Sequence, residues 1–293
     1  MRLLGLSGLH QLTNTSKLLA RKTGLCYITC NATSNIPVRF AVQLSSKVVV
    51  ITGAARGLGR AYAVAMASEG ASVLACDINE CSETVAEVRA AGGRIESAVT
   101  DVSDMKSCQA MADAAVAAFG KIDVLVNNAA LYATLKGGRF ETLDEAQWDA
   151  VMNVNVKGTW QCCKAVVNPM REAGGGSIIN ISSLAGVYGL PYGCDYVASK
   201  AAVIGMTRTM ARELGKDSIR VNAVAPSAVM TEATEEFFGE KFEKAKSVIA
   251  SGQVIQRNLE TTDLTGTVIY LASDASIFVT GQTHMVDGGS WFL

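Results

Sequence analysis

Histidine and paired cysteine motifs are scarce in this chain. Only His10 and His284 occur among the 293 residues, and no C-x-x-C motif is present. Cys26 and Cys30 have the spacing of half a zinc site, but a second half is missing, so we expect no metal centre. The eight cysteines are scattered through apolar and helical stretches, which is typical of reduced thiols in an intracellular protein.

Long apolar runs and runs of basic residues are also missing. No apolar stretch approaches the ~18 residues of a transmembrane helix, and the formal net charge is only −1. We therefore expect a soluble protein whose partner is a small-molecule substrate, with no membrane and no nucleic acid. Because 49% of the residues are hydrophobic, the chain can bury a substantial core.

Acidic residues are missing from residues 1–46, and the first carboxylate of the chain is Glu69. The same segment carries Arg2, Lys17, Arg21, Lys22 and Arg39, with leucines at positions 3, 4, 6, 9 and 12 that would share one helix face. This composition predicts an N-terminal extension that is either a mitochondrial transit peptide or a disordered tail. The protein is accordingly expected in the cytoplasm, or in the mitochondrial matrix if the extension is a targeting peptide.

From Lys47 onward, short apolar segments alternate with longer amphipathic segments. The alternation predicts a single doubly wound α/β domain over residues 47–293, with a parallel sheet of about seven strands covered on both faces. The expected strands are Val48–Thr52, Ser72–Asp77, Ile95–Thr100, Val124–Asn127, Ser177–Ser182, Arg220–Ala225 and Thr283–Val286. The expected helices include Gly59–Glu69, Cys81–Ala91, Met105–Phe119, Trp148–Val167 and Tyr196–Leu214.

An insert of about thirty residues, 227–257, follows the sixth expected strand. It mixes many charges with the large apolar side chains of Phe237, Phe238, Phe242, Val248 and Ile249. This mixture predicts a short amphipathic segment that covers the substrate as a lid.

The first expected strand runs into a glycine-rich turn, TGAARGLG at positions 52–59, and a helix follows. Glycines at such a turn let the backbone approach a pyrophosphate, and the helix N-terminus offers N–H groups to the anion. An ordinary tight turn between strand and helix is the alternative explanation.

Asp77 and Arg56 give opposite indications of the cofactor. Asp77 closes the second expected strand, where a carboxylate accepts hydrogen bonds from the adenosine ribose and repels a 2′-phosphate. Arg56, in the glycine turn, could instead pair with that phosphate. Since the repulsion acts directly at the ribose, the sequence favours NAD over NADP.

Polar residues also follow the third and fourth expected strands. Asp101 could meet an adenine amino group, or it could help to cap the helix that begins near Asp104. Asn127 precedes small alanines that leave room for a ribose, and its amide could tie neighbouring strands together. Asn155 is a polar side chain within an apolar helical stretch, which costs stability and therefore requires a reason.

Tyr196 and Lys200 are four residues apart in an expected helix, so their side chains share one face. A free phenol has a pKa of ~10, and a neighbouring ammonium lowers it, as an acid/base near neutrality requires. Ser183 ends a strand thirteen residues upstream, so a loop can return its hydroxyl to the phenol. On spacing alone, an exposed helical pair is the more common explanation of a tyrosine and a lysine four residues apart.

Taken together, residues 45–291 resemble the short-chain dehydrogenase/reductase family, which has a Rossmann fold. The resemblance implies that Ser183, Tyr196, Lys200 and Asn155 form a catalytic set. It also implies an NAD site that consists of Gly53, Arg56, Gly57, Leu58, Gly59, Asp77, Asp101, Val102, Asn127, Ala129, Tyr196, Lys200, Pro226, Val229 and Thr231. The family is commonly oligomeric, so a homodimer or homotetramer is expected.

The family commonly has glycine where this chain has Ala130 and Ser227. The Pro-Ser form of the second loop, with the Asp-Leu-Thr-Gly of residues 263–266 downstream, resembles the subset that oxidises aryl or cyclic secondary alcohols. The expected substrate residues are Tyr132, Leu184, Tyr188 and Tyr192, with the apolar positions of the insert, and the three tyrosines suit such a ring. Plain packing is the alternative role of each of these side chains.

The expected reaction is hydride transfer between NAD(H) and a secondary alcohol or ketone. An NADP-linked 3-oxoacyl-(acyl-carrier-protein) reductase is the main alternative, supported by Arg56 and opposed by Asp77. A non-catalytic NAD-binding regulator is a more remote alternative, because the Ser-Asn-Tyr-Lys set is complete.

Overall fold

The computed structural model of this chain describes residues 25–26, 38–39 and 43–292. The chain divides into two compact units, Met1–Gln43 and Leu44–Leu293. In the first unit, β1 (Leu25–Cys26) pairs antiparallel with β2 (Val38–Arg39). The leucine-rich helix face of the expected transit peptide lies outside the described residues.

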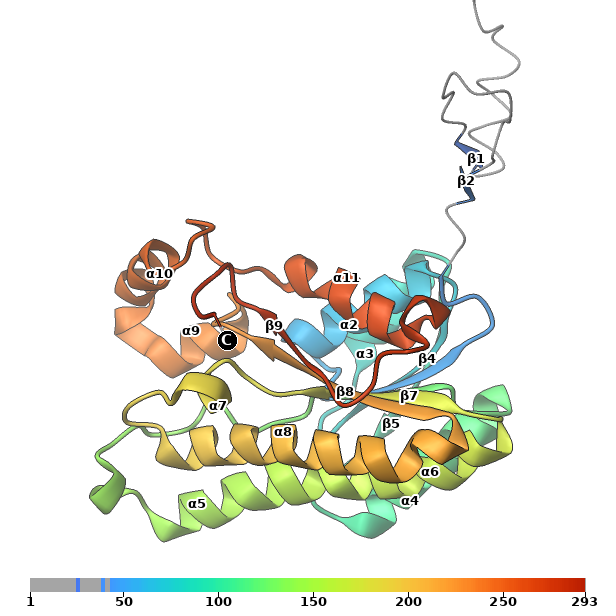
Figure 1. Ribbon diagram of the computed structural model, residues 1–293, viewed down its shortest axis with the longest axis horizontal. Helices are drawn as coiled ribbons and strands as arrows, with labels where there is room; N and C mark the ends of the chain where they lie inside the picture. Colours follow the sequence, from blue (N-terminus) through green and yellow to red (C-terminus); the bar gives the residue numbers. More distant parts are fainter. Residues whose placement is uncertain (1–24, 27–37, 40–42, 293) are drawn as a thin grey trace, which may run out of the picture. The chain divides into compact units, whose positions relative to one another are not determined.

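The second unit is built on one parallel sheet of seven strands in the order β5-β4-β3-β6-β7-β8-β9 (Figure 1). The strands are β3 (Val48–Thr52), β4 (Ser72–Asp77), β5 (Arg94–Val99), β6 (Val124–Asn127), β7 (Gly176–Ile181), β8 (Ile219–Pro226) and β9 (Thr283–Val286). The predicted doubly wound sheet is therefore confirmed, with strand ends that differ by at most one residue. Because the strand order reverses between β3 and β6, a crevice is expected at the carboxyl ends of these strands.

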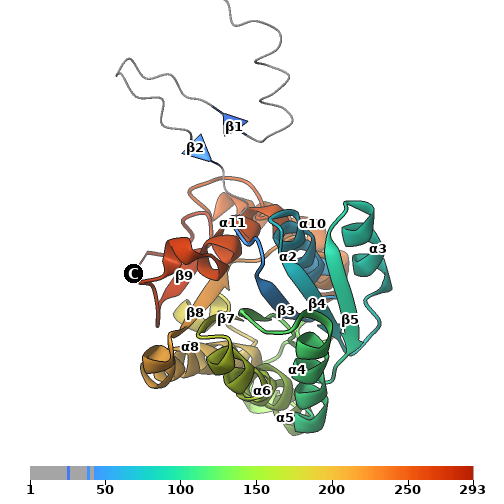
Figure 2. The ribbon, with the colours of Figure 1, turned by 90° about the vertical axis from the view of Figure 1, so that its right-hand side faces the viewer.

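Helices cover both faces of the sheet, because its central strands are apolar on both sides (Figure 2). One face carries α2 (Gly57–Ser68), α3 (Ser82–Ala90) and α11 (Thr261–Ala272). The other face carries α4 (Met105–Phe119), α6 (Thr159–Glu172) and α8 (Cys194–Leu214). Within the part of the chain that the structure describes, no helix has the length and apolarity to cross a bilayer.

Two parts of the helical pattern differ from expectation. The segment Trp148–Val167 is not one regular helix but α5 (Glu145–Val151), a π-helix over Met152–Gly158, and the first half of α6. The helix α11 was not among the expected elements. Its sequence, TTDLTGTVIYLA, is rich in β-branched residues of low helix propensity, so its helical state depends on packing against α2 and the sheet.

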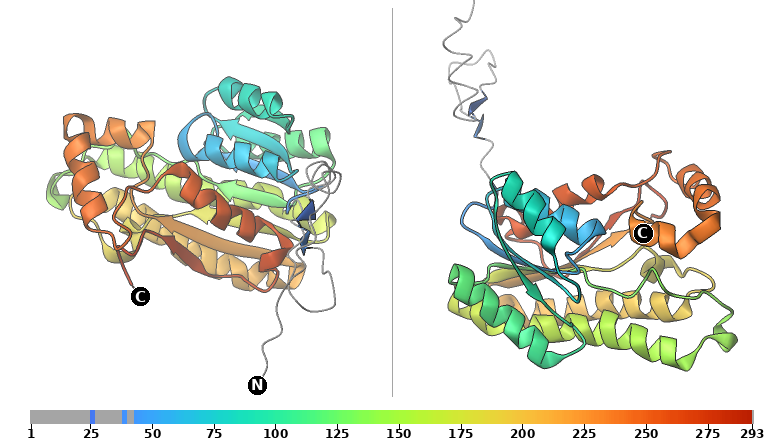
Figure 3. Two further views of the ribbon diagram at one scale, coloured as in Figure 1. Left: turned by 90° about the horizontal axis from the view of Figure 1, so that it is seen from above. Right: turned by 180° about the vertical axis from the view of Figure 1, so that it is seen from behind.

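The insert after β8 forms two short helices, α9 (Glu232–Phe238) and α10 (Phe242–Ser251). Figure 3 shows them beyond the end of the sheet at which β8 terminates. The insert therefore stands at the edge where the carboxyl ends of the strands meet. The role of residues 227–257 as a lid over the substrate stays a prediction.

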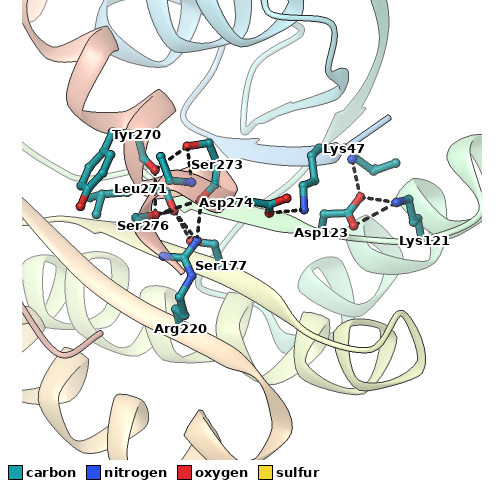
Figure 4. A network of polar contacts seen from close by, with 12 residues as sticks. Lys47, Lys121, Asp123, Ser177, Arg220, Tyr270, Leu271, Ser273, Asp274 and Ser276 are labelled. Atoms are coloured by element: carbon teal, nitrogen blue, oxygen red, sulfur yellow. Dashed lines mark hydrogen bonds and ion pairs between the residues drawn. The ribbon is translucent and has the colours of Figure 1, made fainter. Parts of the chain in front are cut away.

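A polar network ties the opposite edge of the sheet to the C-terminal end of α11 (Figure 4). The Arg220 guanidinium donates to the carbonyl oxygens of Leu271 (2.7 Å) and Ser273 (3.3 Å). Asp123 accepts from the Val48 N–H at 2.7 Å and forms an ion pair with Lys121 at 3.0 Å. These bonds satisfy backbone groups at helix and strand ends, and they are at the far end of the strands from the insert.

We expect Arg220→Met to lower the free energy of unfolding by about 1–2 kcal/mol, because the last carbonyls of α11 lose a donor. The cofactor affinity should not change, since the network is at the other edge of the sheet. Urea unfolding monitored by circular dichroism measures the difference. Arg208→Met, at an exposed position of α8, is the matched control. Equal stability of the two variants would contradict the role assigned to the network.

Candidate active site

A cavity of about 720 Å³ opens at the carboxyl ends of the parallel strands. The glycine turn, the ends of β4, β7 and β8, the start of α8 and the insert all contribute to its wall. The expected cofactor residues in the wall are Gly53, Arg56, Gly57, Leu58, Asp77, Ala129, Tyr196, Lys200, Pro226, Val229 and Thr231. Ser183 lines it too, so residues predicted from distant parts of the sequence meet around one space.

Two glycines of the turn, Gly53 and Gly59, have no room for a side chain. Gly53 has a φ of +65°, and a Cβ there would be 2.8 Å from the Ala129 Cα atom. A Cβ on Gly59 would be 2.0 Å from the Gly53 carbonyl oxygen. The two glycines therefore permit close backbone packing at the start of α2, where Gly53 and Gly57 line the cavity and the first-turn N–H groups have no helical partner. This arrangement fits the diphosphate of a dinucleotide.

The Asp77 carboxylate is held at the end of β4 by backbone donors. It accepts from the Ala55 N–H at 3.1 Å and from the Asn79 N–H at 3.0 Å. Ile78 and Asn79 line the cavity beside it. A rigid carboxylate next to the glycine turn is suited to accept hydrogen bonds from ribose hydroxyls.

The Arg56 side chain, the candidate partner of a 2′-phosphate, forms a bidentate ion pair with Glu236 of α9. One of the two contacts, between Nη2 and Oε2, is 3.0 Å long. The hydrogen bond to Glu236 is the main cause of a raised pKa of Arg56, to which Glu232 and Asp77 also contribute. The positive charge of the glycine turn is thus directed toward the insert.

Four of the expected cofactor residues are not in the cavity wall: Gly59, Asp101, Val102 and Asn127. The Asp101 carboxylate accepts from the N–H and hydroxyl of Ser103 at 2.8 and 2.7 Å, and Asp104 caps α4. Asn127 donates to the Asn180 side chain at 2.9 Å and so joins β6 to β7, as its tying role predicted.

Tyr196, Lys200 and Ser183 are brought together at the end of β7. The Lys200 ammonium is 5.7 Å from the centre of the Tyr196 ring, and it donates to the Ile181 carbonyl at 2.9 Å. Burial raises the pKa of Tyr196, the neighbouring Tyr132 adds to the rise, and a hydrogen bond with Ser183 opposes it. The exposed-pair alternative for the tyrosine and lysine is wrong, since both line the cavity.

Burial also lowers the pKa of Lys200 to about 8, because the side chain is withdrawn from water. Among the ion pairs of the described residues none includes Lys200, and its side chain is part of a residue only 4% exposed. A buried ammonium without a carboxylate partner interacts strongly with any negative charge that forms next to it.

Asn155 lies in the π-helix, which explains a polar residue in an apolar stretch. Its side-chain oxygen accepts from the Leu131 N–H at 2.8 Å, and its amide donates to the Leu131 carbonyl at 3.2 Å and to the Ser199 hydroxyl at 3.1 Å. The Asn155 carbonyl accepts from the Thr159 hydroxyl at 2.8 Å. Asn155 is outside the cavity wall and joins the loop after β6 to α8.

Aromatic side chains form the part of the cavity nearest Tyr196. Tyr132 is stacked on Phe237 of α9, with ring centres 4.8 Å apart, and it is tilted against Tyr196 at 5.4 Å. The expected substrate residues Leu184, Tyr188 and Tyr192 also line the cavity. Leu184 is buried, whereas Tyr188 and Tyr192 are 42% and 67% exposed and so form its rim.

Sequence reasoning missed two contributors to this region. Trp291, near the end of the chain, lines the cavity and packs against Tyr188 with ring centres 5.9 Å apart. Asp195 is a buried carboxylate that accepts from the Gln147 side chain at 2.7 Å and from the Tyr196 N–H at 2.8 Å. The only signal in the sequence for this role of Asp195 is its position directly before Tyr196.

Known proteins are similar over almost all of this unit. A family model described as enoyl-(acyl carrier protein) reductase matches residues 53–290. A 3-oxoacyl-(acyl-carrier-protein) reductase of Thermotoga maritima is 40% identical over 250 residues, which are 85% of this chain and 99% of that protein. A hydroxy(phenyl)methyl succinyl-CoA dehydrogenase subunit of Thauera aromatica is 39% identical over 248 residues, which are 84% of this chain and 97% of that protein.

A solved structure shares the fold. Carveol dehydrogenase of Mycobacterium avium, in complex with NAD, aligns with a TM-score of 0.80 and 32% identity, over 85% of this chain and 98% of that one. The chain therefore belongs to the short-chain dehydrogenase/reductase family, whose members are oxidoreductases that act on CH–OH groups.

We expect Lys200→Met to stabilise the fold and to abolish turnover. Moving the lysine pKa from 10.5 to about 8 costs roughly 3 kcal/mol at neutral pH, and the lost hydrogen bond to Ile181 offsets about 1 kcal/mol of that. Between pH 8 and 10.5 the unfolded chain binds more protons at Lys200 than the folded chain, so wild-type stability rises with pH across this window.

Urea unfolding of both proteins without cofactor, from neutral pH to pH 10, tests this. The stabilisation by Lys200→Met should shrink as the pH rises. Lys106→Met, at an exposed position of α4, controls for the general effect of removing a lysine. A less stable Lys200→Met variant at neutral pH would contradict the cost assigned to the buried ammonium.

Proposed function

We propose that this protein transfers a hydride between NAD(H) and a cyclic or aromatic secondary alcohol or its ketone. The observation that carries the proposal is the meeting of Tyr196, Lys200 and Ser183 in the cavity that the glycine turn and Asp77 also line. Acid/base groups and a dinucleotide cradle thus share one enclosed space.

Tyr196 is the acid/base of the proposed reaction. In the oxidative direction its phenolate accepts the proton of the alcohol hydroxyl, while the electron pair of the carbinol C–H bond leaves as hydride. Bound NAD⁺ supplies the hydride acceptor, the nicotinamide ring. Ser183 donates a hydrogen bond to the substrate oxygen, which orients it and stabilises the charge that develops there.

Lys200 and Asn155 support Tyr196 in different ways. The raised pKa of Tyr196 opposes formation of the phenolate, so a nearby positive charge is required. The Lys200 ammonium, 5.7 Å from the ring centre, supplies it in a setting where charges are weakly screened. Asn155 is a positioning residue, because it bonds Ser199, the residue directly before Lys200.

The proposed preference for NAD rests on Asp77. Its carboxylate is fixed by two backbone N–H groups and would be close to a 2′-phosphate, which it would repel. Ile78, which is 65% exposed beside it, offers an apolar surface at the same edge of the cavity.

The proposed substrate class rests on the aromatic wall. The Tyr132 and Phe237 stack and the buried Leu184 present apolar surface next to the Tyr196 ring, which suits a ring-bearing substrate. Two similar proteins support this class through their names, which include a phenyl-bearing succinyl-CoA and carveol.

A second candidate is the reduction of a 3-oxoacyl thioester with NADPH. It is favoured by the 40% identity to the 3-oxoacyl-(acyl-carrier-protein) reductase of Thermotoga maritima. The ion pair of Arg56 with Glu236 and the carboxylate of Asp77 count against it, because both disfavour a 2′-phosphate.

Tyr196→Phe should reduce turnover by at least about a thousand-fold, because the proton acceptor is lost, while NADH affinity stays within about two-fold. Steady-state oxidation of 1-phenylethanol and NADH fluorescence titration measure the two quantities. Tyr270→Phe removes a hydroxyl from α11, away from the cavity wall, and should behave as wild type. Comparable turnover in Tyr196→Phe would refute the assignment.

The two candidate reactions are separated by saturation series with both cofactors. We expect measurable kcat/KM with NAD⁺ and 1-phenylethanol, and a value at least about ten-fold lower with NADP⁺, since Asp77 repels the 2′-phosphate. Reduction of an acetoacetyl thioester with NADPH is the comparison reaction. Faster reduction of the thioester with NADPH would favour the reductase instead.

A further inference from the structure

The insert places acidic side chains against the glycine turn. Glu236 of α9 forms the bidentate ion pair with Arg56. A Glu232 carboxylate oxygen is 3.8 Å from the point where a Cβ on Gly57 would be. Glu232 and Asp77 also help to raise the pKa of Arg56, so the guanidinium is in an acidic setting in which Glu236 is the residue that bonds it.

The other guanidinium near this turn is also paired. Arg60 donates to the Glu83 carboxylate and to the Ala55 carbonyl, both at 2.7 Å. The remaining cations of the cavity wall are Lys200, which is buried against Ile181, and Lys136. Lys136 precedes the Gly137–Gly138 segment that contacts Tyr192, at the substrate side of the cavity. Among the described residues of the cavity wall, Arg56 is thus the cation on the Asp77 side, and Glu236 holds it.

We propose that Glu236 is a cofactor-specificity residue: by holding Arg56 in an ion pair, it withdraws from a 2′-phosphate the cation that would bind it. The inference rests on the proposed NAD preference, and it adds Glu236 to Asp77 as a second residue that disfavours NADP. Asp77 repels the phosphate from the sheet, whereas Glu236 acts from the insert by occupying both nitrogens of the guanidinium that face it.

The geometry matches what binding of a 2′-phosphate would require. A guanidinium binds phosphate through the same pair of parallel N–H donors with which it binds a carboxylate. NADP could therefore use Arg56 only after the contact with Glu236 is broken. Because both side chains are about half exposed, at 49% and 48%, the ion pair is screened by solvent and the effect is modest.

A purely mechanical role of Glu236, which would only hold α9 in place, makes a different prediction. If the ion pair merely tethers the insert, its loss changes the affinities for NADH and NADPH by the same factor. If Glu236 competes with a 2′-phosphate, its loss changes the NADPH affinity alone. The ratio of the two dissociation constants distinguishes these roles.

The test is fluorescence titration of the full chain with NADH and with NADPH at low ionic strength. In Glu236→Gln we expect the ratio of Kd for NADPH to Kd for NADH to fall about five-fold, as for the loss of an exposed bidentate competitor. Glu235→Gln, one residue away on the same helix and exposed, should leave the ratio within about two-fold. In an Arg56→Gln background, Glu236→Gln should have no further effect on it.

An unchanged ratio in Glu236→Gln, or the same fall in the Arg56→Gln background, would overturn the inference. Tighter binding of NADPH than NADH by the wild-type chain would instead contradict the proposed NAD preference, and the change of the ratio would still decide the role of Glu236. Circular dichroism of each variant verifies that the fold is retained.

Discussion

The arrangement of this protein depends on one ammonium that the fold keeps away from water. Lys200 is 4% exposed and donates to the carbonyl at the end of β7. Withdrawing a charge from solvent is costly, and the two apolar clusters that cover both faces of the sheet supply the stability that permits it. Tyr196 is on the same helix as Lys200, Ser183 follows β7, and the π-helix bonds Ser199, the residue before Lys200. The buried charge that suits the chemistry of the site therefore lowers the stability of the core.

Most of the sheet and most of the site residues could be predicted from the sequence, because both follow from local patterns. A strand such as β3 is apolar along its whole length and buried throughout, and polar residues at strand ends gather at one edge of a parallel sheet. The π-helix could not be predicted in the same way. It depends on bonds from Asn155 to residues 24 and 44 positions away, which no local window contains.

For some residues near the glycine turn, the local sequence pattern does not decide between two roles. A carboxylate after a strand suits both an adenine contact and a tight turn, and at Asp101 the structure shows the turn with Ser103, whereas the adenine contact stays a prediction. Arg56 suits both a phosphate and an acidic partner, and that partner, Glu236, is 180 residues further along the chain. Charge in the glycine turn therefore has to be evaluated together with the charge of the insert that contacts it.

The π-helix also lets this segment hold one residue more than a regular helix without turning its two ends apart. An α-helix turns by about 100° per residue, and the wider turn over Met152–Gly158 absorbs the rotation of the extra residue. Gln147 of α5 therefore still meets Asp195 of α8. A related chain that lost this one residue would keep the orientation of α5 and α6, but it would lose the position from which Asn155 bonds Leu131 and Ser199.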